Sequence, residues 1–306
     1  MNLFKSIVIS LLILMGFGEA LSQPYVIVLG IAQDGGFPHI GCQSECQKAH
    51  DNPDLARYIT SIAVVDPEMG KWWLFEATPD MDKQLQFFQE LTNKSFPYLP
   101  EGIFLTHAHI GHYTGLMYLG REALGSKNVN VYALPEMIHF LETNGPWSQL
   151  IELNNIKPIH HSKNTSIDLS KNLSIEAFQV PHRDEFSTTA GFKINTKDKK
   201  YLFIPDINKW SKWTTDIVSE VQKVDYAFLD ATFFEDGELP NRAMSEIPHP
   251  FVSETMTLFE KEKNNIKQKI YFIHFNHTNP LLFDQNKKLM VETKGFNVSE
   301  QGKSYK

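Results

Sequence analysis

Short apolar runs, separated by polar, glycine-containing or proline-containing stretches, recur along the whole chain. The run from Tyr25 to Ile31 is rich in β-branched residues and predicts a strand. Similar runs predict strands over residues 59–65, 71–76, 102–105, 129–133, 172–180, 226–229 and 269–273. The runs 189–195 and 201–204 lie close together in the sequence and predict a hairpin.

Apolar residues at helical spacing predict the helices between these strands. In the helix expected from Thr78 to about Leu91, they recur every three or four positions. Further helices are expected over residues 113–124, from Pro135 onward, over 213–221 and over 253–260. Strands thus alternate with helices, without an internal repeat, low-complexity tract or long linker. We therefore expect an α/β (α+β) architecture, with sheet inside and helices outside, in one domain over residues 23–306.

The overall composition is that of an ordinary globular protein with room for a large core. The chain has 306 residues, of which 42% are hydrophobic and 21% charged, and its net charge is −7 at pH 7. No run rich in lysine or arginine stands out. We therefore expect a small-molecule substrate and no nucleic-acid partner.

The first 22 residues have the pattern of a signal peptide. Lys5 supplies a positive charge, an apolar stretch from Ile7 to Phe17 follows, and small residues near Ala20 suit a signal peptidase. The apolar stretch is short for a membrane span, although an uncleaved anchor is the alternative. We expect a periplasmic or secreted protein with no stable membrane anchor.

Candidate chemistry is concentrated just after the apolar run 102–105. His107, His109 and His112 lie within six residues, at a predicted strand-to-helix turn where side chains can converge. Neutral imidazole is a common ligand of zinc and related metals. A single histidine would favour an ordinary loop, but three so close together predict a metal site.

Other metal-capable residues also follow predicted strands. His182 and Asp206 come directly after proline residues at two strand ends, and His274 follows the run 269–273. Each of them alone has an ordinary structural explanation. Because ligand sites in sheet proteins gather at one end of the strands, their repeated placement predicts a shared site with the histidine turn.

The two cysteines, Cys42 and Cys46, form a regular series with His39 and His50. In an oxidising compartment the cysteines can pair, while the four groups together would suit a closed tetrahedral zinc site. The spacing alone favours a disulfide or free thiols, and it leaves the zinc site open.

The His-x-His-x-Gly-His turn, with the later histidines and aspartate, resembles the metallo-β-lactamase fold. The resemblance covers about Tyr25 to Met290 and implies a four-layer αβ/βα sandwich with one or two metals at the sheet edges. Gly30 to Pro38, and Phe272 to Pro280, are more narrowly similar to the pyrroloquinoline quinone biosynthesis protein B family. That similarity implies a structural zinc at the cysteine pair Cys42 and Cys46.

The resemblance also implies roles for single residues. One metal would be held by His107, His109 and His182, and a second by His112 and His274, with Asp206 bridging them. Between metals ~3.5–4 Å apart, a bridging water becomes hydroxide and attacks an ester, lactone, amide or phosphodiester. Zn²⁺ is the expected metal, one or two per chain, with Mn²⁺ or Fe²⁺ as alternatives. Glu76 would orient a ligand histidine.

One residue of the turn departs from the pattern of the fold. Gly111 stands where an aspartate usually precedes the third histidine. Its absence leaves three alternatives: a single metal, a different metal, or a carboxylate from elsewhere, such as Asp34.

Two further histidines have candidate catalytic roles. The segment from Asp230 to Phe234, followed by His249 between two prolines, resembles one found in phosphodiesterases of this fold. It implies that His249 assists proton transfer to the leaving group or binds phosphate; a surface loop histidine is the alternative. His277 could donate a proton or replace His274 as a ligand.

Three functions are consistent with these observations. The first is an exported metal-dependent hydrolase, using a metal-bound hydroxide on an ester, lactone or phosphodiester. The second is an iron-dependent oxidative role like that of the quinone-biosynthesis family, and the third is a metal-binding scaffold with a degenerate site. β-Lactam hydrolysis ranks below ester or phosphodiester cleavage, because a fold alone does not determine a substrate.

Overall fold

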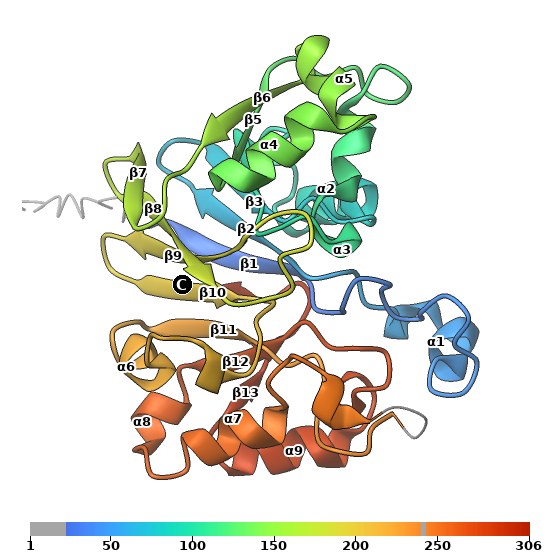
Figure 1. Cartoon of the computed structure of the whole chain (residues 1–306), viewed down its shortest axis with the longest axis vertical. Helices are drawn as coiled ribbons and strands as arrows, with labels where there is room; N and C mark the ends of the chain where they lie inside the picture. The colour runs from blue at the N-terminus through green and yellow to red at the C-terminus, as the bar shows by residue number, and fades with distance from the viewer. Residues whose placement is uncertain (1–22, 240–242) are drawn as a thin grey trace, which may run out of the picture.

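Two β-sheets packed face to face, with helices on their outer faces, form the computed structural model of this chain (Figure 1). The structure describes residues 23–239 and 243–306, so the predicted signal peptide, residues 1–22, lies outside the described residues. The succession of helices, sheet, sheet and helices confirms the expected αβ/βα sandwich.

The first sheet has seven strands within the described residues and combines both pairing directions. In spatial order it contains β14 (Ser304–Tyr305), β1 (Tyr25–Gly30), β2 (Ser61–Asp66), β3 (Lys71–Phe75), β4 (Gly102–Phe104), β5 (Val129–Ala133) and β6 (Ile156–His160). Pairing is antiparallel from β14 to β3 and parallel from β3 to β6.

The second sheet also has seven strands in the described part of the chain. In spatial order it contains β13 (Asn297–Val298), β12 (Ile270–Ile273), β11 (Tyr226–Asp230), β10 (Lys200–Ile204), β9 (Thr189–Thr196), β8 (Leu173–Val180) and β7 (Thr165–Ser170). The strands from β10 to β13 are parallel, and those from β7 to β10 are antiparallel. The predicted hairpin of β9 and β10 is confirmed.

Helices cover the outer face of each sheet (Figure 1). The first sheet is covered by α2 (Met81–Leu91), α3 (Ile110–Tyr113), α4 (Pro135–Thr143) and α5 (Trp147–Glu152). The second is covered by α6 (Ile217–Gln222), α7 (Val252–Leu258), α8 (Asn264–Lys267) and α9 (Gln285–Thr293), while α1 (Gln47–Asp51) projects on a loop. Among the described helices, none has the length and apolar character needed to cross a membrane.

Alternation along the central strands places side chains in two separate cores. In β3, Trp72 and Leu74 belong to the cluster beneath α2, whereas Trp73 and Phe75 belong to the cluster between the sheets. Successive side chains of a strand point to opposite faces, so a strand covered on both sides is apolar at every position. This explains why β3 appears in the sequence as an unbroken apolar run.

Aromatic rings fill the space between the sheets. Phe75 stacks on Phe104 of the neighbouring strand, with ring centroids 4.7 Å apart, and meets Phe192 edge to face at 5.2 Å. Phe192 belongs to β9 of the second sheet, so Phe75 joins the two sheets directly. Such pairs add about 0.5–1.5 kcal/mol beyond the burial of their apolar area.

The helix predicted over residues 113–124 is wrong. In the structure, α3 ends at Tyr113, a 3₁₀ helix spans Thr114–Leu119, and residues 120–124 form a bend and turns. The backbone N–H of Gly115 donates to the carbonyl of Ala77, 2.9 Å away. It therefore cannot take part in the hydrogen bonds of an α-helix. A Cβ at Gly115 would lie 2.1 Å from the carbonyl oxygen of Thr78, so this close approach requires glycine.

Other predicted helices are shifted at their ends. The one expected over 213–221 begins only at Ile217, because the carboxylate of Asp216 accepts the backbone N–H groups of Val218 and Ser219 as an N-cap. The one expected over 253–260 is α7, Val252–Leu258. The helix from Pro135 begins where predicted.

The strand directions determine where the functional residues gather. β3 and β4 are parallel, and so are β10, β11 and β12. The carboxyl ends of parallel neighbours meet at one edge of a sheet, and the loops after these strands meet at the same rim of the sandwich. The residues that follow these strands are therefore neighbours in space.

The inter-sheet aromatic cluster yields a stability prediction. Phe75→Ala should lower the free energy of unfolding by about 3–5 kcal/mol, because it opens a cavity where the ring is fully buried. Leu289→Ala on α9, where the side chain is 62% exposed, should change it by no more than about 0.5 kcal/mol. Denaturation in urea measures both, and equal effects would contradict the described core.

Candidate metal centre

The histidine turn follows β4 and lies at the rim between the sheets. Its first two histidines turn their ring nitrogens toward one point: His107 Nε2 lies 2.7 Å from His109 Nδ1. His107 is almost fully buried, and His109 is partly exposed. Two imidazoles one residue apart can therefore grip one cation from the same short loop.

Two residues from the second sheet meet this pair. His182 follows β8 and Asp206 follows β10. The Asp206 Oδ2 atom lies 3.3 Å from His107 Nε2 and 3.2 Å from His182 Nε2. With His109, these residues form a group whose ligand atoms all lie within 4.8 Å of one another. We call it the first ligand group.

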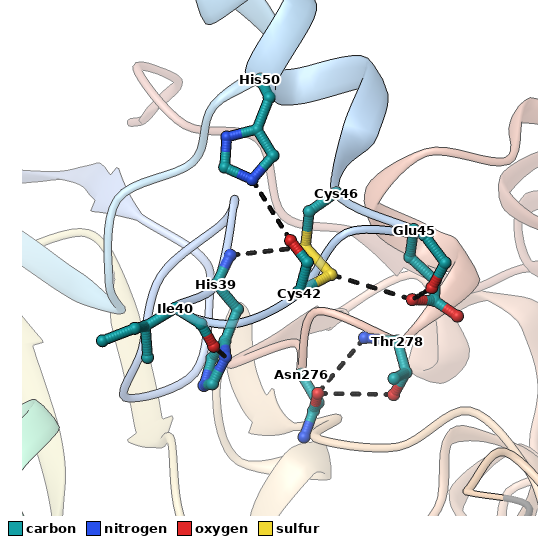
Figure 2. The surroundings of a disulfide bond; sticks show 9 residues. His39, Ile40, Cys42, Glu45, Cys46, His50, Asn276 and Thr278 are labelled. Atoms are coloured by element: carbon teal, nitrogen blue, oxygen red, sulfur yellow. Dashed lines mark hydrogen bonds between the residues drawn. A yellow bond between two sulfur atoms is a disulfide. The ribbon is translucent and has the colours of Figure 1, made fainter.

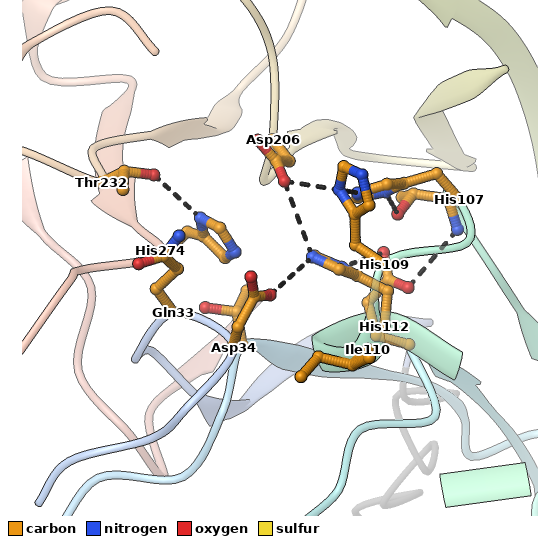
Figure 3. Close-up of polar contacts among 12 residues, drawn as sticks. Gln33, Asp34, His107, His109, Ile110, His112, Asp206, Thr232 and His274 are labelled. Carbon is orange, nitrogen blue, oxygen red and sulfur yellow. Dashed lines mark hydrogen bonds and ion pairs between the residues drawn. The ribbon is translucent and has the colours of Figure 1, made fainter. Parts of the chain in front are cut away.

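A second ligand group lies beside the first and consists of Asp34, His112 and His274, whose ligand atoms also lie within 4.8 Å of one another. His112 Nε2 is 3.3 Å from Asp34 Oδ1 and 3.7 Å from Asp206 Oδ2. Figure 3 shows His112 between the two carboxylates. Asp206 therefore lies where a carboxylate shared by both groups would have to be.

Several of these ligand atoms are buried and make no hydrogen bond of acceptable geometry, although some have the ion-pair contacts given above. They include the Nε2 atoms of His112, His182 and His274, and the Oδ1 atom of Asp34. Leaving a buried polar group unpaired costs about 1–3 kcal/mol. Imidazole and carboxylate groups are the ligands that divalent zinc, manganese and iron accept, so the donor set fits a metal.

Hydroxyl groups hold the ring nitrogens that point away from the centre. Thr106 Oγ1 lies 2.8 Å from His107 Nδ1, and Thr232 Oγ1 lies 3.0 Å from His274 Nδ1. Contacts of this kind fix the tautomer and orientation of a ligand histidine. Both rings thus present Nε2 to the centre.

Carboxylates do the same for the other two histidines of the turn. Glu185 Oε2 lies 3.0 Å from His109 Nε2, which leaves Nδ1 for the centre. Glu76 Oε1 lies 3.5 Å from His112 Nδ1, and its other oxygen accepts the backbone N–H of Thr106 at 3.4 Å. Glu76 thus stands where it can orient a ligand histidine.

Two of these buried residues have left-handed backbone conformations. Glu76 has a φ of 72° and His274 a φ of 70°, a region that residues other than glycine rarely adopt. Such conformations cost of order 1–3 kcal/mol and are typical of functional sites, where the surroundings enforce them. His274 faces the centre from this backbone conformation, whereas Glu76 faces the outer nitrogen of His112.

Burial and neighbouring charges shift the pKa values of the site in opposite directions. Burial lowers the pKa of His107 well below its ordinary value and also lowers that of His274, which favours neutral imidazole. Burial opposes the charge of Asp206, but His182 and His249 outweigh it and hold the Asp206 pKa well below its usual range. For His112, the charges of Glu76 and Asp34 outweigh burial and raise the pKa.

His249 is buried against the centre and not in a surface loop. Its Nδ1 lies 2.8 Å from Asp230 Oδ2 and 3.1 Å from Asp206 Oδ1. Burial alone would lower the pKa of His249, but these carboxylates raise it to about 10. Its ring centroid is 5.4 Å from that of His182, so it flanks the first ligand group.

The structure does not bring His277 into this cluster. Its ring stacks on that of His39, with centroids 4.4 Å apart, and His274 is the histidine that joins the second ligand group. Within the described residues, no metal-capable group contains His277.

The structural zinc expected at Cys42 and Cys46 is contradicted. The two sulfur atoms are joined in a disulfide, so neither is a thiolate that could bind a metal (Figure 2). The flanking histidines contact backbone instead: His39 Nδ1 lies 2.7 Å from the carbonyl oxygen of Ile40, and His50 Nε2 lies 3.3 Å from that of Cys42.

Sequence reasoning gave no role to four residues that contact the ligands or His249: Thr106, Glu185, Asp230 and Thr232. Asp230 ends β11 just as Asp206 follows β10, so its place at a strand end was a usable signal. The threonines and Glu185 carry no signal of their own, because their contacts depend on how the loops fold.

Comparisons with known sequences agree with this architecture. A profile described as the beta-lactamase superfamily domain matches residues 71–275. Coenzyme PQQ synthesis protein B of Methylorubrum extorquens (strain PA1) is 24% identical over 302 residues, which cover 91% of this chain and 98% of that protein.

Two solved structures share the fold. The crystal structure of Zn²⁺-bound PqqB from Methylobacterium extorquens has a TM-score of 0.76 at 22% identity, covering 92% of this chain and 99% of that one. A diphosphatase described as a member of the PhnP family has a TM-score of 0.65 at 18% identity, covering 93% of this chain and 97% of the other. At these identities the likeness shows the fold alone.

The ligand groups predict that metal stabilises the protein. Zn²⁺ at 100 times its dissociation constant should raise the free energy of unfolding of the metal-free protein by about 2.7 kcal/mol. His107→Ala should remove most of this gain, whereas His160→Ala, at an exposed position at the end of β6, should keep it. Denaturation with and without Zn²⁺ measures both; full stabilisation of His107→Ala would contradict the site.

Proposed function

This chain belongs to the beta-lactamase superfamily, and from that premise we propose that it is a metal-dependent hydrolase acting on phosphodiester, ester or lactone bonds. The observation that carries the proposal is the convergence on Asp206 of buried imidazole nitrogens from His107, His182 and His112. The fold alone would not support it, because one fold hosts many functions.

In this proposal the first ligand group would hold one metal, and His112 and His274, with Asp206 shared, would hold another. We propose Zn²⁺, with Mn²⁺ or Fe²⁺ as alternatives. When bound, such ions polarise the oxygen under attack and lower the pKa of water. Thr106, Thr232, Glu76 and Glu185 keep the ligand histidines in place, so the site is preorganised before substrate arrives.

His249 is proposed to move a proton. Asp230 holds its Nδ1, which leaves Nε2 as the ring atom that can donate to the oxygen of a leaving group. Proton transfer by a positioned side chain contributes about 10²–10⁴-fold to a rate. Asp230 acts as a positioning residue in this scheme, because it orients the ring without touching the substrate.

A phosphodiester is the substrate class that the rim of the site favours. The Arg183 guanidinium lies 3.4 Å from His109 Nε2, and its side chain is 53% exposed. Guanidinium groups bind phosphate through paired hydrogen bonds, and an anionic substrate beside the first ligand group would replace the 3.8 Å ion pair that Arg183 makes with Glu185. The fold shared with a diphosphatase is consistent with this choice.

A second candidate function is favoured by the sequence similarity to coenzyme PQQ synthesis protein B, which extends over 91% of the chain. It is an iron-dependent oxidative role, and it predicts iron in the purified protein with little hydrolysis. A degenerate scaffold, the third reading, would bind metal without catalysing either reaction.

Metal-loaded protein should hydrolyse a p-nitrophenyl phosphodiester, and a chelator should abolish the activity. His249→Ala should lower kcat by about 10²–10⁴-fold on a diester that releases an alkoxide. The loss should be much smaller on the p-nitrophenyl diester, because p-nitrophenolate leaves without a proton. His160→Ala is the matched control and should leave both rates unchanged.

Two results would contradict this scheme at different points. Equal losses on both diesters would show that His249 has only a structural role. Absence of hydrolysis in protein shown to carry its metals would contradict the hydrolase itself, and iron in such inactive protein would favour the oxidative function.

We also propose that the chain is exported, on the strength of the signal-peptide pattern in residues 1–22. The Cys42–Cys46 disulfide is consistent with an oxidising compartment. Expressed in a Gram-negative host, the protein should appear in the periplasmic fraction or the medium without its first residues. A cytoplasmic protein that still begins at Met1 would contradict export.

A further inference from the structure

We infer that Asp34 is the carboxylate that completes the second metal site, and that it is delivered from the loop after β1 into space that Gly111 leaves free. The inference rests on the proposed metal function and assigns a ligand from outside the histidine turn. It answers whether this chain can hold a second metal without an acid at position 111.

The position of the Asp34 carboxylate is the first support. Its Oδ1 atom lies 3.3 Å from His112 Nε2, and His274 Nε2 belongs to the same group within 4.8 Å. All three atoms are buried, and apart from the ion-pair contact between Asp34 and His112 no hydrogen bond satisfies them. Facing one another beside the shared Asp206, they form a donor set of the kind that binds a divalent cation.

Gly111 is the second support. A Cβ built at this residue would lie 2.1 Å from Asp34 Oδ1 and 2.7 Å from Asp34 Cα. No side chain fits there while Asp34 keeps its position. Gly111 is not one of the described glycines that have a positive φ. The need for glycine at this position therefore comes from the close approach of the loop and not from an unusual backbone angle.

Backbone pairing explains why Asp34 arrives at this point. Gln33 N–H donates to the carbonyl oxygen of Phe275 at 2.8 Å, and Phe275 N–H donates to that of Ile31 at 2.8 Å. The side-chain amide of Asn276 also donates to Gln33 Oε1, 3.0 Å away. Gln33 and Phe275 are thus paired in the segment that joins the two sheets. Because Asp34 follows Gln33 and His274 precedes Phe275, this pairing fixes the distance between Asp34 and His274.

The test uses metal-free protein titrated with Zn²⁺ by calorimetry, with the bound zinc counted by elemental analysis. The wild-type protein should bind close to two ions per chain. Asp34→Asn keeps the size of the side chain and removes its charge, so it should bind one ion as before and the second at least tenfold more weakly. Asp198→Asn, at an exposed carboxylate in the turn between β9 and β10, should behave as wild type.

A second variant tests the close approach of Asp34 to Gly111 without removing any ligand. Gly111→Ala should displace Asp34 and weaken the second ion in the same way. Gly145→Ala, where nothing lies within 4 Å of the added Cβ, should leave both ions bound. Thermal unfolding of each metal-free variant shows whether it is folded.

The outcomes separate this inference from the proposed function. Two ions bound by Asp34→Asn with wild-type affinities would overturn the assignment of Asp34 and leave the hydrolase intact. A folded wild-type protein that binds no ion would overturn the proposed function, and the assignment with it. Selective loss of the second ion in both Asp34→Asn and Gly111→Ala would support the assignment.

Discussion

The site depends on one buried carboxylate surrounded by imidazoles. Asp206 is 2% exposed, and its Oδ2 atom lies within 3.7 Å of ring nitrogens from three histidines. A charge removed from water is tolerated only when it is paired, because its desolvation costs several kcal/mol. Burial lowers the pKa of His107 and favours its neutral form, so this ring does not balance the charge of Asp206. A cation shared among these groups satisfies the carboxylate and the unpaired nitrogens together.

The fold provides this arrangement through the ends of its strands. The histidine turn comes from the first sheet, while His182, Asp206 and His274 come from the second. The rim is held together by the segment around Ala32, which forms bridges to Ile59 in one direction and Phe275 in the other. The left-handed backbone at Glu76 and His274 marks the places where function, and not local preference, determines the conformation.

Much of the fold was predictable, because strands buried on both faces are apolar at nearly every position. β1 and β3 are such strands, whereas β8 alternates apolar residues with the half-buried Ser174, Glu176 and Gln179. Metal-capable residues follow the ends of β4, β8, β10 and β12. β6 was missed because Lys157 and Pro158 interrupt its apolar pattern, and α9 because only Val291 of its residues is buried. In these elements tertiary contacts, and not local pattern, decide the structure.

The limits of prediction within the site have the same cause. The sequence indicated which histidines could meet, because a strand end is a local signal. It left open whether Asp34 reaches the histidine turn, since that contact depends on the pairing of Gln33 with Phe275, far along the chain. It also left open whether the cysteines pair. It did not decide whether His274 or His277 is the ligand.

Diffraction from crystals grown with Zn²⁺, measured on both sides of the zinc absorption edge, tests the central claim most directly. The account predicts two anomalous peaks, one on each side of Asp206, with the first bounded by His107, His109 and His182 and the second by Asp34, His112 and His274. A protein crystallised under saturating zinc that shows no anomalous peak at Asp206 would contradict it.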